Sequence, residues 1–303
     1  MSRSYTATGI ILKAMPMGES DRLLTILTVE HGLVRAIAPG ARKHKSRLGG
    51  RSGQFVINTM MLVNGKQLDK LVQAETTRSF PALGADLGKL TASQYLAELV
   101  LCQALSEQPQ EDLFSLFVEH LERIEAAAGD SVLACLVHGV FHLLVLAGLA
   151  PEVRYCCLTQ QEVVPDLLTP NWQVEFSPTA GGVILGQPVN REITSFSMAQ
   201  RVRTNEGRYS FNRAQRAGGA SRSPAIMTLS AAELAVLQRL GQPELLSSQA
   251  TPGAECSTSV QAIRQIWQRL EHLLRRYAEY HFDRPIRSAA LIDACFPVVA
   301  RLD

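Results

Sequence analysis

The hydrophobic pattern of this 303-residue chain changes its period once, near Phe80 and Pro81. Before that point, apolar and polar residues alternate in short runs at 6–12, 23–28, 33–38, 55–63 and 68–74. A period of two is typical of β-strands, and Asn64-Gly65 predicts a type I′ hairpin turn, in which both central residues need a positive φ. Five strands in about seventy residues, with Gly9 where a strand must bend, predict a Greek-key barrel of the OB type. An SH3-like barrel would show nearly the same pattern.

After Pro81, apolar residues recur every three or four positions, as in amphipathic helices. The pattern predicts helices over 87–105, 111–128, 131–149, 230–240 and 260–280. The third is apolar almost all round, so we expect it at the centre of a bundle. The prediction is an α+β fold with an N-terminal five-stranded OB-type β-barrel over 1–80 and a mostly α-helical domain over 81–303.

A one-sign charged stretch lies between the third and fourth predicted strands. From Leu33 to Leu68 the chain has no Asp or Glu, whereas seven cationic residues fall inside it: Arg35, Arg42, Lys43, Lys45, Arg47, Arg51 and Lys66. Such a patch repels itself, and a nucleic-acid phosphate backbone is its natural counter-charge. We take these residues as the candidate DNA-binding site. The alternative is a solvated basic loop without a partner.

A second basic stretch lies at 191–225, where Gly218-Gly219 and several serines predict a flexible segment. Its secondary candidates for DNA contact are Arg201, Arg203, Arg208, Arg213 and Arg216.

The sequence holds none of the common catalytic motifs, such as G-x-S-x-G, GxxxxGK[ST] or HExxH. His138 and His142 lie one helical turn apart, which is also metal-ligand spacing, but no third ligand is nearby and we favour core or interhelical hydrogen bonding. Cys156-Cys157 has no second CxxC, so we expect no metal there. An enzyme that uses Cys156 or the two histidines is the remaining catalytic hypothesis.

Neither a signal peptide nor an apolar run long enough to span a bilayer is evident. We therefore expect a cytoplasmic protein without membrane contact.

Several motifs together resemble one protein family. Near the N-terminus they lie at residues 5–12, at 18–28 with its G-E-S-D-R run, at 31–33 and at 39–43; further matches are at 74–75, 95–99, 176–178, 181–182 and 286–288. These resemble the RecO family of recombination-mediator proteins over nearly the whole chain. We expect Asp21 and Arg22 of the G-E-S-D-R run to organise the turn before the second strand.

The resemblance implies an OB barrel on a helical domain that binds single- and double-stranded DNA and anneals complementary strands. It also implies work in the RecF pathway of DNA repair, in which such a protein and RecR help load RecA onto strands coated with single-stranded-DNA-binding protein (SSB). The implied partners are RecR and the SSB C-terminal tail, and the implied location is the nucleoid. The family has no catalytic residues, and its basic barrel positions correspond to Arg35, Arg42, Lys43, Lys45, Arg47 and Arg51.

Two features depart from the family pattern. The Arg-rich segment from Arg201 to Arg222 is longer than the family leads us to expect, and it is either a further DNA-contacting surface or a disordered insertion. The other departure concerns the cysteines. Many members carry a four-cysteine zinc site, but here the first pair is reduced to Cys156-Cys157 and the second would fall at Leu185 and Pro188. We therefore expect a degenerate zinc-finger-like insertion over 151–190, without zinc, held by packing of Trp172, Phe176, Val183 and Ile184. The rival interpretation of the whole chain is an RNA-binding or ribosome-associated OB protein, because the charge pattern would be the same.

Overall fold

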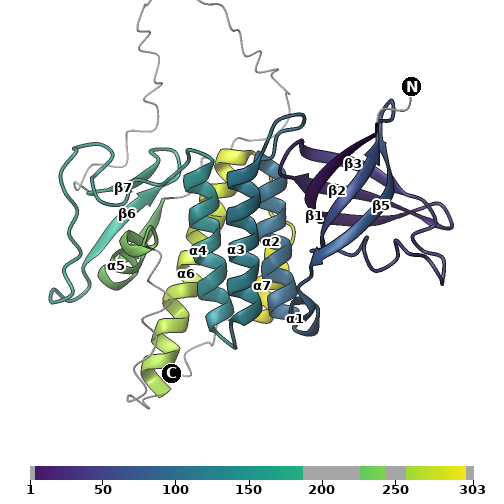
Figure 1. Ribbon diagram of the computed structural model, residues 1–303. Coiled ribbons are helices and arrows are strands. Elements are labelled where there is room, and N and C mark those ends of the chain that lie inside the picture. Colours follow the sequence, from purple (N-terminus) through teal and green to yellow (C-terminus); the bar gives the residue numbers. More distant parts are fainter. Residues whose placement is uncertain (1–3, 187–225, 243–256, 298–303) are drawn as a thin grey trace, which may run out of the picture. The chain divides into compact units, whose positions relative to one another are not determined.

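The computed structural model describes residues 4–186, 226–242 and 257–297 of the chain (Figure 1). The chain forms two compact units, one of residues 1–151 and 232–303 and the other of residues 152–231. The domain boundary predicted at residue 80 lies inside the first unit and stays a prediction. The Arg-rich segment at 191–225 lies outside the described residues.

Five strands of the first unit close into a barrel in the order β1-β2-β3-β5-β4. They are β1 (Ser4–Met17), β2 (Asp21–Thr28), β3 (Gly32–Ala38), β4 (Ile57–Val63) and β5 (Asp69–Arg78). The parallel pairing of β3 with β5 completes the barrel, and all its other strand pairs are antiparallel. Alternate apolar side chains fill the interior, among them Ile11, Leu24 and Met60, which are fully buried. The predicted OB-type barrel is confirmed.

Strand β1 extends five residues past the predicted end at Leu12. Its pairing with β2 shifts register between Ile11 and Lys13 and then continues to Met17. An extra residue of this kind bends a strand. The predicted bend at Gly9 is therefore wrong, since Gly9 lies in regular pairing with Thr28. Gly9 is needed for space: a Cβ atom there would lie 2.8 Å from the carbonyl oxygen of Leu27.

The predicted type I′ turn at Asn64-Gly65 is also wrong. Neither residue has a positive φ, and the β4–β5 connection spans residues 64–68. The Gly65 amide donates a hydrogen bond to the Asp69 carboxylate at 3.0 Å, and a Cβ on Gly65 would collide with the Leu68 carbonyl oxygen. A longer loop, stabilised by a side chain, replaces the tight turn.

Beyond the barrel the first unit is helical. The helices are α1 (Pro81–Ala85), α2 (Leu87–Gln103), α3 (Glu111–Ala126), α4 (Ser131–Leu146), α5 (Ala231–Arg239), α6 (Ser257–Phe282) and α7 (Ala289–Cys295). Of these, α4 lies beside α3 and α6 (Figure 1). It also contacts α2, and its side chains are buried almost all round. The prediction of a central apolar helix is confirmed.

The second unit contains a three-stranded antiparallel sheet in the order β7-β6-β8. Its strands are β6 (Gln173–Ser177), β7 (Gly182–Ile184) and β8 (Met227–Ser230). We expected one or two short strands here, and β8 comes from far along the chain. Phe176 and Val183 are fully buried, as predicted, whereas Trp172 and Ile184 are only partly buried.

Backbone hydrogen bonds join the β2–β3 turn to the α2–α3 connection within the first unit. The Leu33 amide donates to the Leu105 carbonyl at 2.8 Å, Glu107 donates to His31 at 3.0 Å, and Gln110 donates to Val29 at 2.8 Å. Gly32 lies at the centre of this contact with a φ of +64°, and a Cβ atom there would lie 2.1 Å from the Leu105 carbonyl oxygen. Both the backbone conformation and the space at this position require glycine.

Replacing Gly32 with alanine is expected to lower the free energy of unfolding by about 2–5 kcal/mol, because it combines a strained φ with a backbone collision. Gly18→Ala is the matched control, since Gly18 has a φ of +58° but open space around it. The control should lose only about 1–2 kcal/mol. Chemical denaturation measures the free energy of unfolding of both variants. Equal losses in the two variants would contradict the conclusion that the space around Gly32 requires glycine.

Candidate nucleic-acid interface

The basic loop, defined as residues 39–56, connects β3 to β4 and is held in shape by the G-E-S-D-R run at 18–22. Asp21 accepts hydrogen bonds from the Gly40 amide and the Ser20 hydroxyl, both at 2.8 Å. These two bonds lower the pKa of the Asp21 carboxyl. Arg22 donates to the Gly49 carbonyl and the Ser52 hydroxyl, both at 2.8 Å. Asp21 and Arg22 are structural, as predicted, but they organise the basic loop as well as the turn beside it.

Arg42 has a double part in this arrangement. Its amide donates to the Ser20 carbonyl at 2.8 Å and its guanidinium to the Gly18 carbonyl at 3.0 Å. It therefore fastens the loop while its side chain stays exposed.

The loop brings five of the seven predicted cations together. Arg42, Lys43, Lys45 and Arg47 are exposed and Arg51 is half-buried. Among the described residues none of the five forms an ion pair, although Lys43 is near enough to Asp21 to lower its pKa further. The loop therefore presents an uncompensated positive surface.

The other two predicted cations lie apart from the basic loop. Arg35 is exposed in the middle of β3. Lys66 is exposed in the β4–β5 connection. Because β5 pairs in parallel with β3 at Ala36–Asp69, Lys66 lies toward the start of β3, whereas the basic loop leaves its end. The structure does not bring Lys66 to the loop.

The outer face of β1, β2 and β3 carries two rows that sequence reasoning missed. In the first row Lys13 pairs with Thr25, and Thr25 with Arg35; in the second, Met15 pairs with Leu23 and Leu23 with Ile37. Directly opposed residues share one face of a sheet, so an apolar row lies beside two cations. Met15 remains 39% exposed. The missed signal was the continued alternation past Leu12, where the predicted strand ended.

The aromatic residues of the barrel do not form a stacking surface. Phe55 is only 3% exposed and packs against Phe117 of α3 with ring centroids 6.3 Å apart. Tyr5 donates its hydroxyl to the Asp69 carboxylate at 2.5 Å and stands edge-on to His31. The exposed apolar surface of the barrel therefore comes from the Met15–Leu23–Ile37 row and not from aromatic rings.

Three histidines of the bundle, His120, His138 and His142, are joined to other segments by hydrogen bonds. His142 of α4 faces the Leu240 carbonyl through Nε2 at 3.1 Å and His120 of α3 through Nδ1 at 3.2 Å. A carbonyl only accepts, so His142 carries its proton on Nε2 and accepts at Nδ1. Arg123 donates to Nδ1 of His138 at 2.8 Å. The prediction of interhelical hydrogen bonding for His138 and His142 is confirmed.

These buried histidines are neutral in the folded protein. Burial, together with the neighbouring His142 and His138 rings and Arg123, lowers the pKa of His120 to about 2. Burial, the His142 ring and Arg123 lower the pKa of His138 to about 4. In an unfolded chain both side chains would titrate near 6.5.

Stability should therefore be full above pH 6.5 and fall as the pH drops toward 4, because the unfolded chain takes up protons that the folded protein refuses. Each such histidine adds about 1.4 kcal/mol per pH unit to the slope. A His138→Gln variant should show a shallower slope of unfolding free energy against pH. His44→Gln, in the exposed basic loop, is the control. An unchanged slope in the His138 variant would show that His138 does not contribute to the loss of stability at low pH.

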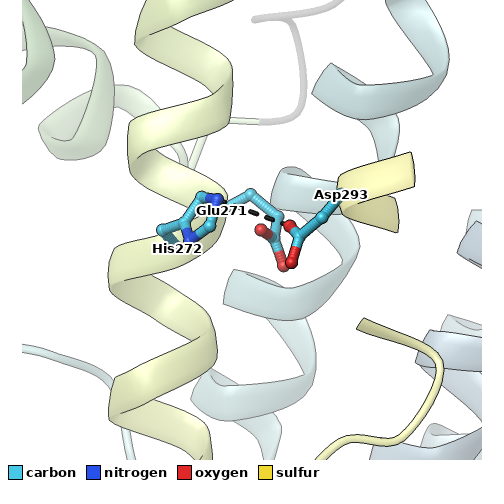
Figure 2. Close-up of side chains that lie close together, drawn as sticks. All are labelled: Glu271, His272 and Asp293. Carbon is cyan, nitrogen blue, oxygen red and sulfur yellow. Dashed lines mark ion pairs between the residues drawn. The ribbon is translucent and has the colours of Figure 1, made fainter. Parts of the chain in front are cut away.

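Three side chains of types that can bind a metal ion lie close together at α6 and α7, and they belong to an ion-pair network. Glu271 and His272 of α6 lie beside Asp293 of α7 (Figure 2), and their ligand atoms are within 4.8 Å of one another. Arg275 donates to Glu271 at 2.6 Å and to Asp293 at 2.7 Å, so a guanidinium already neutralises both carboxylates. The network ties α7 to α6.

The residues of the second unit do not fit a zinc ion. Zinc in a structural site takes four sulfur or nitrogen ligands, and the described part of this unit offers only Cys156 and Cys157. The Cys156 sulfur is fully buried and accepts hydrogen bonds from the amides of Leu185 at 3.2 Å and Thr159 at 3.5 Å. Burial raises the pKa of the Cys156 thiol, but a hydrogen bond with the Thr159 side chain, together with those from the backbone amides of Leu185, Thr159 and Leu158, outweighs it and lowers the pKa to about 7. Pro188 lies outside the described residues.

None of the helices in the described ranges combines the length and the apolar character that a membrane span requires.

Comparison with known proteins gives matches along most of the chain. Residues 1–80 match the family described as recombination protein O N terminal, and residues 84–187 match recombination protein O C terminal. The DNA repair protein RecO of Nostoc sp. is 49% identical over 98% of this chain and 97% of its own length. RecO of Acaryochloris marina is 50% identical over 98% of this chain and 96% of its own, and that of Trichodesmium erythraeum is 41% identical over 100% and 98%.

Proposed function

Because the chain belongs to the RecO family of DNA repair proteins, we propose that it is a recombination mediator that binds single- and double-stranded DNA and anneals complementary strands. The observation that carries this proposal is the basic loop, in which exposed cations stand without ion pairs among the described residues. Proteins that neutralise phosphates release condensed counterions, and this release favours binding.

Annealing follows from the same electrostatics. Two DNA strands repel each other through their phosphates, and cations that neutralise part of that charge lower the cost of bringing them together. Loop contacts reach the backbone rather than the base edges, so the bases stay free to pair. The process needs no nucleotide hydrolysis. The secondary candidates Arg201, Arg203, Arg208, Arg213 and Arg216 lie outside the described residues and are proposed as a further DNA contact.

We also propose that the protein acts by binding rather than by catalysis. The histidines at 138 and 142 are engaged in hydrogen bonds, and Cys156 is buried beneath backbone amides. RecR and the acidic C-terminal tail of SSB are its proposed protein partners, with which it would help load RecA in the RecF pathway. Its proposed place of work is the nucleoid in the cytoplasm. The names of the relatives favour DNA over the RNA-binding alternative.

Reversing two exposed loop charges, Lys43→Glu with Lys45→Glu, is expected to weaken DNA binding and flatten its salt dependence. Each phosphate contact contributes about 0.7 to the slope of log K against log salt for single strands, so the slope should fall by about 1.4. The control is Arg239→Glu with Arg276→Glu, which reverses two exposed charges on the helices. Fluorescence anisotropy over a salt series measures the slopes. An unchanged slope in the loop variant would refute the site, and tighter binding of structured RNA than of single-stranded DNA would favour the RNA alternative.

Strand annealing tests the function itself. Complementary oligonucleotides, naked or coated with SSB, should anneal faster with the protein and without ATP, and RecR should change the rate on coated strands. A fluorescence-quenching assay follows the reaction, with the Lys43/Lys45 variant as the negative control. If naked strands anneal no faster with the protein than without it, the proposed activity is wrong.

A further inference from the structure

A groove lies inside the first unit where the barrel meets the helices. Its cavity has a volume of about 630 Å³, and we call it the junction groove. Its buried lining residues are apolar and form the floor: Leu12, Ala97 and Ile286 are buried and Leu101 is partly buried. Gln54 and Gln94, which carry side-chain amides, also line the groove. It is bordered by strand β1, helix α2 and the segment between α6 and α7.

Cations dominate the rim of the groove. Lys13, Arg284 and Arg287 are exposed there, and within the described ranges no ion pair involves them. The acidic side chain in the lining is Glu98, which accepts hydrogen bonds from the amides of Arg287 at 2.7 Å and Ser288 at 3.1 Å. Glu98 is thus held in place but keeps its charge. The lining has three cations against this one carboxylate, so its net charge is positive.

The groove continues the outer face of the barrel. Lys13 lines the groove and also ends the cross-strand row that leads through Thr25 to Arg35. Neighbouring strands lie about 4.8 Å apart, so Arg35 and Lys13 are roughly 10 Å apart along this row. Together with Arg284 and Arg287 they form a track of cations from β3 into the groove.

An apolar floor with a cationic rim is the combination by which proteins hold single strands, since bases need a surface to lie on and phosphates need counter-charge. We propose that the junction groove receives an unpaired nucleotide of a DNA strand, with its base on the apolar floor and its phosphates at Lys13, Arg284 and Arg287. A base inside a duplex is stacked and paired and cannot enter. The groove therefore provides preference for single strands, whereas the basic loop holds the phosphates of either form. This inference rests on the proposed function.

The charge-reversed variant Arg284→Glu with Arg287→Glu tests the proposal. Its affinity for a short oligothymidylate should fall roughly tenfold, because two phosphate contacts are replaced by repulsion and the nucleotide no longer stays in the groove, while its affinity for duplex DNA changes much less. The Arg239→Glu with Arg276→Glu variant is the control and should keep both affinities. Equal losses for single strand and duplex would overturn the proposal.

Cys102 offers a second readout in the unaltered protein, because it lines the groove and is partly exposed. Oligothymidylate should slow its alkylation several-fold, as measured by peptide mass spectrometry, and Cys157 in the other unit is the internal reference. If oligothymidylate leaves Cys102 unprotected while the Lys43/Lys45 variant still loses DNA binding, the proposal that the groove binds a nucleotide is wrong and the proposed function stands. If the unaltered protein binds no DNA at all, the proposed function fails first. Protection by an acidic peptide and not by oligothymidylate would make the groove a protein-docking site and overturn the inference.

Discussion

Three backbone hydrogen bonds between the β2–β3 turn and the α2–α3 connection fix where the barrel attaches to the helices. Main-chain atoms carry this contact, so its geometry does not vary with side-chain rotamers, and Gly32 leaves the space it needs. Phe55 and Phe117 add an apolar contact between barrel and bundle. An ion pair between Arg78 of β5 and Glu122 of α3 adds to this attachment. The helices cover one part of the outer barrel surface, whereas Lys13 and Met15 remain exposed. The junction groove lies where β1 meets α2 and the segment between α6 and α7.

A second constraint acts on the basic loop. Its cations repel one another, so the loop needs interactions from outside itself to keep one conformation. The Asp21 carboxylate and the Arg22 guanidinium supply them through hydrogen bonds to Gly40, Gly49 and Ser52. These two side chains form their hydrogen bonds with main-chain atoms and a hydroxyl of the loop, and not with its cations. The loop is therefore ordered without an ion pair to Lys45 or Arg47 among the described residues. Order and uncompensated charge are thus present in the same loop.

Prediction from sequence succeeded where the signal is local. Alternation predicted the barrel strands, and the 3.6-residue period predicted α2, α3, α4 and α6. The lack of a third metal ligand near His138 and His142 favoured core or interhelical hydrogen bonding, which the structure shows. It failed where a distant partner decides the outcome. The bend in β1 depends on its pairing with β2, and the Gly65 loop depends on Asp69. β8 becomes a strand only by pairing with β6, more than fifty residues earlier in the chain.

The sequence by itself determined the family, a five-stranded barrel before residue 80 and the concentration of positive charge between β3 and β4, because motif, period and charge are properties of neighbouring residues; the strand order that distinguishes an OB-type from an SH3-like barrel is seen in the structure. Only the tertiary structure decided that the G-E-S-D-R run shapes the basic loop, that Lys66 lies away from it, and that Lys13, Arg284 and Arg287 surround one apolar groove. Residues 13 and 284 are 271 positions apart. No local pattern relates such residues, because strand register and the packing of helices against the barrel bring them together.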